Sequence, residues 1–547
     1  MAAPVDRNTR SYRSQGLFCG TRVGAFADSI LPSPAHRGRM TEMSAESYWM
    51  ATSKAKTYPA LSEQAEADVA VVGGGIAGIA TAWELARTGR SVLLLEADRL
   101  AAGVTGYTTG RLSAAHPWIY AQLRDGYGME TARLYARSQQ EAVEHVIATA
   151  ERLGIDADIE RRPSHVYVEQ PERVQDLRVE VEAAQQAGLA ASFVTGTDLP
   201  YEVAGALRVE DQVQFHPRRY LLALVEELSR TGGRVHEHTR VIEMDQGRPT
   251  RLVTDTGATV RANQVVIATL FPALGWELLG SRLTPLRELV IATPISEDSD
   301  PGGMYITREE NTRSVRTAPY RDGQRLLLIT GESFPPGTTD VAARRQHLIE
   351  WTRRHFQVND IAYWWAAQDL DTADKIPYVG RISDNVYVAT GYARSGMSHG
   401  IMTGRLLKGL ICGQEPPWAD VYAPGRRHFT QEIGPISKTL WSKTRRAAAD
   451  HARAMATSAD DIPRGSGAVV RHHGRLRAVY KGDDGTAHWL SPYCSHFRCL
   501  VSFNHTERVW ECPCHGCRYA PDGSVLQGPA TASLHPETPA PGTPRQG

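Results

Sequence analysis

The stretch DVAVVGGGIAGIATAWELARTGRSVLLLE, residues 68–96, decides the fold of the first part of the chain. Its apolar ends, DVAVV and SVLLLE, are typical of buried parallel strands. Between them, a glycine turn leads into the helical pattern AGIATAWELARTG, which we expect to end at Gly89. This order predicts a strand–helix–strand unit, and hence an α/β domain built on a parallel sheet.

The glycine turn predicts a nucleotide site. Gly73, Gly75 and Gly78 form the pattern G-x-G-x-x-G between the strand and the helix. The first glycine allows a tight turn, the second lets the backbone approach a pyrophosphate, and the third lets the helix pack on the strand. Glu96 ends the second strand, where a carboxylate can accept hydrogen bonds from both ribose hydroxyls. We therefore predict a dinucleotide-binding site.

Length and composition limit the class of protein. The chain has 547 residues, 41% hydrophobic and 22% charged, with 61 Lys+Arg and 61 Asp+Glu. This length predicts several domains, and the balanced charge gives no sign of a nucleic-acid surface. No apolar stretch approaches the roughly eighteen residues of a membrane span. Because residues 1–20 also lack the apolar core of a secretory signal, we expect a cytoplasmic protein.

A second motif lies near the C-terminal end of the chain. Cys494-Ser-His496 is followed after fifteen residues by Cys512-Pro-Cys514-His515. Two thiolates and two imidazoles at this spacing are what a Rieske [2Fe–2S] cluster requires, so Cys494, His496, Cys512 and His515 are the predicted ligands. A zinc site is the alternative, but the spacings C-x-H and C-x-C-H fit zinc loops poorly.

Changes in composition divide the chain into five segments. We predict a mostly disordered leader at 1–65, an α/β region at 66–430, a helical linker at 431–456, a region of short strands at 457–535 and a disordered tail at 536–547. Within the α/β region, residues 262–269 and 384–391 are each expected to form a strand that runs into a turn. Residues 288–295 and 325–330 are expected to form strands of a separate sheet.

The residues after the nucleotide motif favour FAD as the cofactor. The acidic end of the second strand argues against NADP. The small and hydroxyl residues of the segment 103–111 could pass close to a flavin and donate hydrogen bonds to it. The residues expected to contact the cofactor here are Thr105, Gly106, Thr108 and Thr109.

Together these features resemble the glycine/D-amino-acid oxidase family of FAD-dependent oxidoreductases. The segments that carry the resemblance further are 211–217, 240–241, 368–380 and 389–400. It implies a Rossmann-like FAD-binding domain of the glutathione-reductase type with an antiparallel substrate domain. It also implies that the backbone at Val241 contacts the adenine. The loop of Gly396, Met397 and Ser398 would lie against the isoalloxazine, with the following helix pointing its N-terminus at the ring.

The C-terminal segment resembles Rieske domains beyond the four ligands, which implies an all-β domain. Cys499 and Cys514 occupy the positions that form a disulfide under the cluster in the respiratory-type subclass. Tyr519 fits the position whose phenol binds a ligand thiolate, and Gly528-Pro529 resembles the proline loop that covers the cluster.

The sequence departs from the Rieske pattern at two positions. Arg498 stands where glycine is usual, which could alter that loop. Cys517 stands where a serine often donates to a cluster sulfide. Because hydrogen bonds to sulfur tune the potential, we expect a lower cluster potential than in respiratory Rieske centres.

The whole arrangement resembles bacterial FAD-dependent oxidoreductases that carry a C-terminal Rieske domain. This resemblance implies dehydrogenation of an amine or amino acid, with electrons passing singly from reduced flavin through the cluster to an external acceptor. The acceptor would be a one-electron carrier protein or a quinone. The candidate catalytic residues are Arg394, which could bind a substrate carboxylate, His399, as an acid or base, and His116, near the flavin.

Three alternatives use the same motifs differently. A reductase that feeds a partner oxygenase would need a second nucleotide fingerprint, and the sequence contains none. A terminal Rieske oxygenase would need a 2-His-1-carboxylate iron site, and no such domain is visible. A non-enzymatic redox sensor would use Cys517 and the Cys499–Cys514 pair as its switch.

Overall fold

The computed structural model describes residues 45–272, 274, 277–307, 309, 312–426 and 458–538. The predicted linker at 431–456 lies outside the described residues, as do the predicted leader up to residue 44 and the predicted tail from residue 539. The first described element is helix α1 (Tyr48–Ala51), whose Tyr48 and Trp49 are buried. The Trp49 indole N–H donates to the Thr108 carbonyl oxygen at 2.6 Å, which ties this segment to the nucleotide region.

The stretch 68–96 lies in the middle of a mostly parallel sheet, as predicted. The parallel strands, in their order across the sheet, are β17 (Val386–Thr390), β10 (Thr259–Ile267), β1 (Ala65–Val72), β2 (Val92–Leu95) and β7 (Arg234–His236). Antiparallel strands extend it: β16 (Tyr378–Ser383), β9 (Thr250–Thr254) and β8 (Val241–Asp245). Val69, Val71 and Val72 of β1 are buried, which explains their apolar run.

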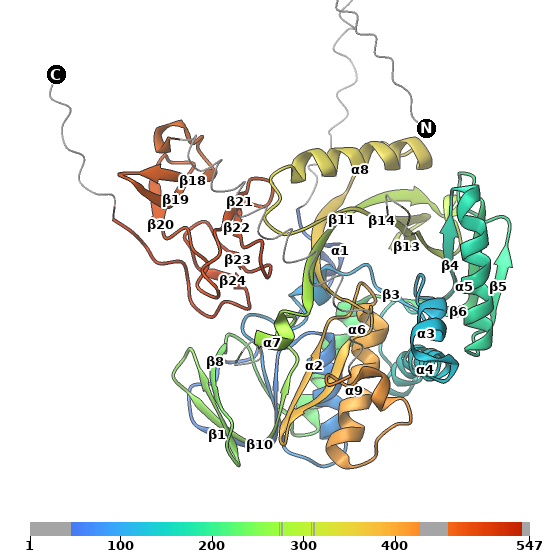
Figure 1. Ribbon diagram of the computed structural model, residues 1–547, viewed down its shortest axis with the longest axis horizontal. Helices are drawn as coiled ribbons and strands as arrows, with labels where there is room; N and C mark the ends of the chain where they lie inside the picture. Colours follow the sequence, from blue (N-terminus) through green and yellow to red (C-terminus); the bar gives the residue numbers. More distant parts are fainter. Residues whose placement is uncertain are drawn as a thin grey trace, which may run out of the picture. The chain divides into compact units, whose positions relative to one another are not determined.

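Two helices from distant parts of the chain pack closely beside this sheet (Figure 1). Helix α2 (Ile76–Ala86) follows the glycine turn, and α9 (Gly396–Cys412) follows β17. A Cβ atom at Gly400 would lie 2.5 Å from Ile76 Cγ2, and one at Gly404 would lie 2.8 Å from the Ala80 Cβ. These glycines therefore let α9 approach α2 closely, which brings the start of both helices to the same edge of the sheet. Helix α6 (Pro217–Arg230) also packs against α2.

A nine-stranded, largely antiparallel sheet forms the substrate domain. Its strands are β15 (Tyr363–Thr372), β11 (Leu283–Ser296), β14 (Gln324–Phe334), β13 (Arg313–Arg321), β12 (Met304–Thr307), β4 (Glu160–Val168), β6 (Gly205–Gln214), β3 (Arg111–Leu112) and β5 (Ala191–Val194). The predicted strands at 288–295 and 325–330 lie in it as β11 and β14. The other helices are α3 (Tyr120–Tyr127), α4 (Met129–Leu153), α5 (Val174–Gln186), α7 (Glu277–Gly280) and α8 (Val341–Phe356).

The two faces of this sheet have different surroundings. Leu289 and Ile291 of β11 pack with Leu348 of α8. The intervening Val290 packs with Trp365 on the other face, together with Trp49 of α1. A register shift interrupts β11 between Arg287 and Leu289, where the strand pairs with β14.

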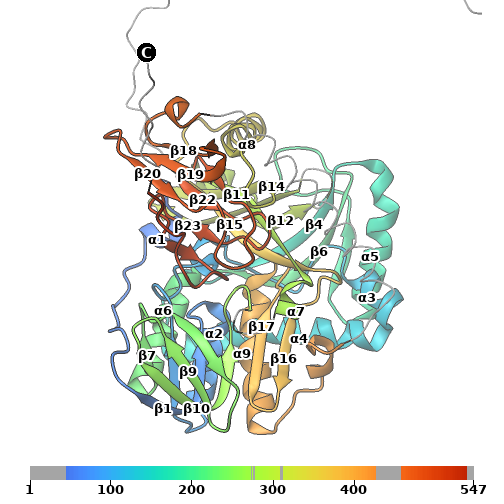
Figure 2. The ribbon, with the colours of Figure 1, turned by 60° about the vertical axis from the view of Figure 1, so that its left-hand side comes forward.

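The C-terminal region is all-β and has its own core (Figure 2). One antiparallel sheet contains β18 (Ser466–His472), β19 (Arg475–Lys481) and β20 (Ala487–Leu490). The other contains β21 (Ser502–Asn504), β22 (Val509–Glu511), β23 (Arg518–Tyr519) and β24 (Val525–Gln527). Among the helices in the described ranges, none has the length and apolar character needed to cross a membrane.

Candidate functional site

The glycine turn forms one end of the candidate site. Gly73 has φ +110°, and a Cβ atom there would lie 2.7 Å from the Ala268 carbonyl oxygen. A Cβ atom at Gly78 would lie 1.8 Å from the Gly73 carbonyl oxygen. No other residue fits these two positions without movement of the backbone. The Thr105 hydroxyl accepts the Ile76 N–H at 3.0 Å and so connects the start of α2 to the segment 103–111.

Glu96 ends β2 beside this turn. Its Oε2 accepts the Gly74 N–H at 2.6 Å, and its Oε1 accepts the Asp98 N–H at 2.9 Å. Burial raises the pKa of the Glu96 carboxyl, while the two backbone donors oppose that shift. The carboxylate is thus held in one orientation at the strand end, as the sequence motif predicts.

A cavity of about 840 Å³ begins at the turn and extends to the substrate sheet. The predicted cofactor residues that line it are Gly73, Gly75, Glu96, Thr105, Thr108, Thr109, Val241, Gly396 and Met397. Gly78, Gly106 and Ser398 do not line it. Gly106 has a packing role, because a Cβ atom there would lie 2.7 Å from the Ala101 carbonyl oxygen. Residues that are far apart in the sequence therefore line the same cavity.

Two of the three candidate catalytic residues lie behind the wall of this cavity. His116 and His399 are each bonded to the Tyr135 hydroxyl, at 2.6 Å and 3.0 Å. His116 Nε2 also lies 3.0 Å from the Ser398 hydroxyl. Burial lowers the pKa of His399 to about 3, so its ring is neutral at neutral pH. The structure brings both histidines together, but as a buried support of the loop that begins α9.

Arg394, the third candidate, does line the cavity. Its Nη1 lies 2.9 Å from Glu288 Oε1, and its Nη2 lies 3.7 Å from Asp371 Oδ2. Its backbone N–H donates to Asp369 Oδ2 at 2.5 Å. The guanidinium is therefore engaged by carboxylates of the protein. Glu288 and Asp369 also line the cavity, and the sequence signal for Glu288 is the charged pair Arg287-Glu288 inside a largely apolar strand.

The predicted iron–sulfur ligands lie on two loops of matching geometry. In the first loop, the Cys494 N–H donates to the Cys499 carbonyl oxygen at 2.9 Å. In the second, the Cys512 N–H donates to the Cys517 carbonyl oxygen at 2.8 Å. Each loop also contains a hydrogen bond back to the carbonyl oxygen of its first cysteine, from the Arg498 N–H at 2.9 Å and from the Gly516 N–H at 3.0 Å.

Arg498 and Gly516 occupy the same place in the two loops. Arg498 has φ +53° and Gly516 has φ +75°, so both adopt the left-handed conformation. The arginine therefore keeps the loop geometry that a glycine would give, at a cost of about 1 kcal/mol. The hydrogen bonds of the first loop match those of the second, so Arg498 does not alter the hydrogen-bond pattern of its loop.

The donor atoms gather as a two-thiol, two-imidazole set. Cys494 and Cys512 are buried, and the ring centroids of His496 and His515 are 5.1 Å apart. The Tyr519 hydroxyl lies 3.1 Å from the Cys494 sulfur. Tyr519 thus lies where the resemblance placed it. Cys517 is also buried.

Cys499 and Cys514 form a disulfide. The Cys512 sulfur lies within 4.8 Å of both disulfide sulfurs. With these two cysteines joined to each other, Cys494, Cys512 and Cys517 are the free thiols of the two loops, and two of them are the predicted cluster ligands.

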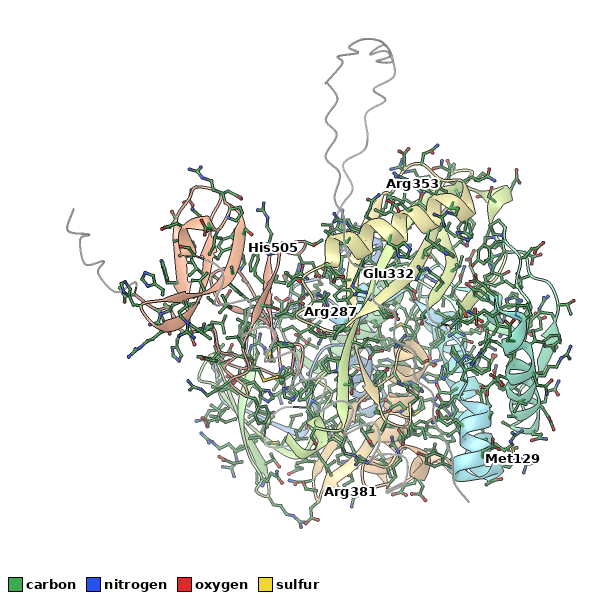
Figure 3. The ribbon with its side chains drawn as sticks, turned by 45° about the horizontal axis from the view of Figure 1, so that its top comes forward. Met129, Arg287, Glu332, Arg353, Arg381 and His505 are labelled. Carbon is green, nitrogen blue, oxygen red and sulfur yellow. A yellow bond between two sulfur atoms is a disulfide. The ribbon has the colours of Figure 1, made fainter. Side chains whose placement is uncertain are left out.

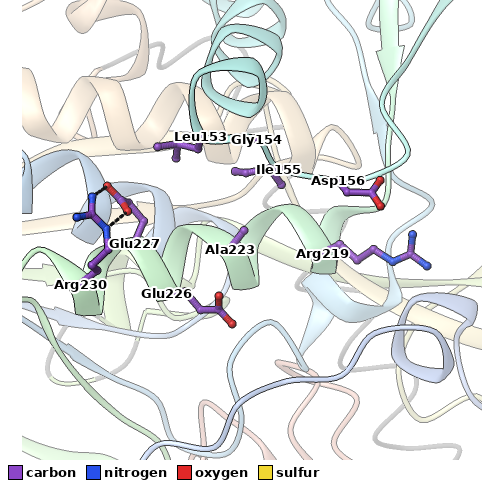
Figure 4. Close-up of a pocket in the computed structure, with 9 residues that line it drawn as sticks. All are labelled: Leu153, Gly154, Ile155, Asp156, Arg219, Ala223, Glu226, Glu227 and Arg230. Carbon is purple, nitrogen blue, oxygen red and sulfur yellow. Dashed lines mark hydrogen bonds and ion pairs between the residues drawn. The ribbon is translucent and has the colours of Figure 1, made fainter.

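A second hollow of about 360 Å³ lies on the surface near the end of α4 and along α6 (Figure 4). Glu227 and Arg230 form an ion pair on one side of it, and Arg219 lines it as well. None of the predicted site residues lines this hollow.

Comparison with known proteins identifies the family. A family model described as FAD dependent oxidoreductase (DAO) matches residues 68–410. The chain belongs to this family. A second family model, for the Rieske [2Fe-2S] domain, matches residues 453–538. This FAD-dependent oxidoreductase therefore has a C-terminal Rieske domain, and its cofactors are FAD and a [2Fe–2S] cluster.

One relative matches nearly the whole length of the oxidoreductase, and two others match about two thirds of it. It is 30% identical to YhfW, a Rieske 2Fe-2S iron-sulfur protein of Bacillus subtilis (strain 168), over 89% of this chain and 97% of YhfW. It is 26% identical to gamma-glutamylputrescine oxidoreductase of Escherichia coli (strain K12), over 68% of this chain and 90% of that protein. The crystal structure of glycine oxidase from Geobacillus kaustophilus matches 67% of this chain and 100% of its own, with a TM-score of 0.55 and 20% identity. The predicted fold is confirmed.

The large cavity of the oxidoreductase fits FAD on structural grounds. Helix α2 starts at the cavity, and its N-cap Gly75 places no side chain there. Backbone N–H groups at the helix start suit a pyrophosphate. The other helix that starts at the cavity, α9, directs its positive end to the opposite part through Gly396 and Met397.

The Rieske domain of the oxidoreductase is joined to its substrate sheet by a buried ion cluster around Arg287, the residue labelled in Figure 3. Arg287 of β11 is 1% exposed and donates to Glu507 at 2.6 and 2.8 Å and to Glu511. Glu511 also accepts the Gly337 N–H at 2.9 Å. Burial opposes the charge of Arg287, but the two carboxylates outweigh it and raise the pKa of its guanidinium. No local pattern in the sequence marks this pairing, because its members lie more than 200 positions apart.

Proposed function

We propose that this oxidoreductase dehydrogenates an amine or amino acid and passes the electrons through its cluster to an external one-electron acceptor. FAD held in the large cavity would supply a hydride acceptor for a C–H bond next to nitrogen, and a cluster held by the Rieske loops would supply transfer of single electrons. The substrate loses one hydride and one proton to become an imine, which water hydrolyses. Two acceptor molecules each take one electron. The names of gamma-glutamylputrescine oxidoreductase and glycine oxidase support such substrates.

The observation that carries the proposal is the position of Phe271. This residue lines the large cavity, and its ring centroid lies 5.0 Å from that of His515 and 6.0 Å from that of His496. One side chain of the flavin domain thus contacts both imidazoles of the cluster site. A packed contact of this kind favours electron transfer between the two sites within the chain.

Other residues of the flavin domain and of the Rieske domain lie near the contact between Phe271 and His515. Gln368 of β15 donates to the Gly516 carbonyl oxygen at 3.3 Å, next to His515. Gly528, Pro529 and Ala530 of the Rieske domain line the cavity together with the nucleotide turn. These contacts connect the two domains beside the predicted cluster ligands.

The other side of the imidazole pair supports transfer to an external acceptor. Phe497 is 50% exposed, and its ring centroid lies 4.3 Å from that of His496 and 5.3 Å from that of His515. A carrier protein or quinone that contacts Phe497 comes within reach of the cluster. We propose that this exchange takes place in the cytoplasm.

The test is anaerobic mixing of the purified holoprotein with amines and amino acids. We expect flavin bleaching followed by a Rieske electron paramagnetic resonance signal. In Phe271→Ala, bleaching should keep its rate while the cluster signal develops at least about tenfold more slowly. Phe497→Ala is the matched control, because it removes a ring from the same imidazoles on the exposed side and should leave this internal step unchanged.

Two outcomes contradict the proposal. If the flavin bleaches and the cluster never becomes reduced, the two sites are not connected. If no amine or amino acid bleaches the flavin, the substrate class is wrong. A separate sample of Phe271→Ala is oxidised and then reduced with dithionite. Its Rieske electron paramagnetic resonance signal checks that the variant still carries the cluster.

A further inference from the structure

Glu288 presents a carboxylate to the substrate side of the large cavity. It lies on β11 at the register shift between Arg287 and Leu289. Irregularities of this kind often re-aim a side chain next to an active site. The carboxylate accepts two hydrogen bonds, and both go to Oε1. The donors are the Ser333 hydroxyl at 2.6 Å and Arg394 Nη1 at 2.9 Å. Within the described residues, Glu288 Oε2 has no hydrogen-bond donor.

Arg394 is committed to this arrangement and is poorly placed to bind a substrate carboxylate. Its side chain is 19% exposed and lies between Glu288 and Asp371. Its backbone is constrained as well, because Ala393 and Arg394 both have positive φ and Asp369 holds the Arg394 N–H. Recognition of a carboxylate by arginine uses both arms of the guanidinium fork. Here the Nη1 arm would first have to leave Glu288, and the Nε atom on the other edge of the guanidinium is buried.

The other arginines that line the cavity near the sheet are also engaged. Arg111 donates to the Ala115 carbonyl oxygen at 2.5 Å and to the Ser164 hydroxyl at 2.7 Å. At the Rieske side, Arg287 and Arg518 pair with Glu507. A substrate carboxylate would have to displace these partners.

Among the described residues, Glu288 is the carboxylate of this group that offers a free oxygen to the cavity. Glu288, Asp369 and Asp371 are the carboxyl groups around Arg394, and Lys375 is the second cation, with its Nζ 2.5 Å from Asp371. Burial raises the pKa of Asp369, so Glu288 and Asp371 balance the two cations, and a cation bound at Glu288 Oε2 adds no second positive charge to an already positive group. Apolar and neutral residues also line the cavity, among them Val290, Ile306, Thr312, Ser314, Thr330 and Trp365.

We propose that the substrate is an amine that carries a positive charge at its Glu288 end and no carboxylate on the carbon that loses the hydride. This inference rests on the proposed function and narrows it from amines and amino acids to cationic amines. Glu288 Oε2 binds the ammonium group, and Arg394 positions Glu288. The apolar wall accommodates the methylene chain between the ammonium group and the reacting carbon.

The experiment compares four ligands of similar length on the anaerobic holoprotein: 1,4-diaminobutane, butylamine, 4-aminobutanoate and 2-aminopentanoate. Dissociation constants come from the change in the flavin absorption spectrum, and the bleaching rate is recorded separately. We expect 1,4-diaminobutane to bind at least about tenfold more tightly than butylamine, and both acids to bind more weakly still.

The variant Glu288→Gln sharpens the test. It should remove the preference of the protein for 1,4-diaminobutane over butylamine. It also releases Arg394 from its partner, so the affinity for 2-aminopentanoate should rise. Glu226→Gln is the matched control, because Glu226 lies in the small surface hollow and should change neither preference.

The outcomes separate the inference from the proposed function. If 2-aminopentanoate binds the wild-type protein and bleaches its flavin as well as 1,4-diaminobutane does, the inference is overturned while the proposed function stands. If none of the amines and amino acids bleaches the flavin, the proposed function itself fails. The wild-type comparison decides the inference even if Glu288→Gln does not fold.

Discussion

The FAD-binding region and the Rieske domain prepare their cofactor sites by different means. In the first, the site depends on atoms that are missing: Gly73 and Gly78 have no room for a side chain, and Gly75 presents none to the cavity. In the second, the site depends on side chains, with Cys494, Cys512 and two histidines at the tips of matching loops. Damage to the first region should therefore come from added atoms, and damage to the second from removed ones.

The largest expected effect tests whether the two regions form one unit. Arg287→Met removes the more buried of the two arginines that pair with Glu507 and Glu511 and leaves them only Arg518, which should lower the free energy of unfolding by about 3–5 kcal/mol. The measurement is urea unfolding of the holoprotein. The control is Arg508→Met, which breaks an exposed pair with Asp483 and should cost at most about 1 kcal/mol. Equal losses in the two variants would show that the ion cluster does not join the domains.

The next effect separates two roles of glycine in the first region. Gly78→Ala places a Cβ atom 1.8 Å from the Gly73 carbonyl oxygen and should lower stability by about 3 kcal/mol, with loss of FAD. In Gly75→Ala, the nearest described atom to the new Cβ is Thr105 Oγ1 at 3.2 Å. This variant should keep the stability of the FAD-free protein and lose only FAD. Unfolding curves and flavin content distinguish the two, and equal stability losses would contradict the assignment.

The pH dependence of stability tests the cavity between the regions. Burial raises the pKa of Asp369 to about 7, with Asp371 adding to the shift and Arg394 opposing it. The folded protein then binds a proton that the unfolded chain, with a carboxyl pKa of about 3.9, releases. Stability is therefore expected to fall as pH rises from about 4 to about 7, by about 1 kcal/mol per pH unit.

Asp369→Asn should flatten this dependence, and the unfolding free energy measured from pH 5 to pH 8 checks it. A slope that is the same in the variant and in the wild type would assign the dependence to other groups.

The smallest expected effect compares the same position in the two Rieske loops. Arg498→Gly removes a left-handed arginine and should raise stability by up to about 1 kcal/mol. Gly516→Ala should lower it, because a Cβ atom there would lie 2.3 Å from Gln368 Nε2 and φ is +75°. Thermal unfolding of the two variants gives the signs. Stabilisation by both changes would show that the loops are not equivalent.

Local motifs account for the part of the structure that could be predicted. Residues 68–96 alternate between apolar runs and a glycine turn, so strand, helix and strand were expected where β1, α2 and β2 lie. The strands β10, β11, β14 and β17 were also predicted, because each is a short apolar run long enough to be recognised. The ligand pattern around Cys494 and Cys512 indicated the cluster because its chemistry depends on spacing within short loops.

The catalytic candidates show where sequence reasoning stops. Arg394, His399 and His116 were chosen for residue type and for position near the flavin-facing loops. Only the structure shows that both histidines lie behind the cavity wall with Tyr135, and that Arg394 is engaged by Glu288. Burial and partners decide what a charged side chain can do, and both depend on residues from distant strands.

The sequence by itself determined the two cofactors, because a glycine turn and a Cys/His spacing each act within one short segment. The tertiary structure alone decided how the two sites meet. Phe271 reaches His515, Gln368 reaches Gly516 and Arg287 reaches Glu511 across separations of roughly 150–240 residues. No local pattern marks such contacts, since they arise only when the substrate sheet and the Rieske loops pack together.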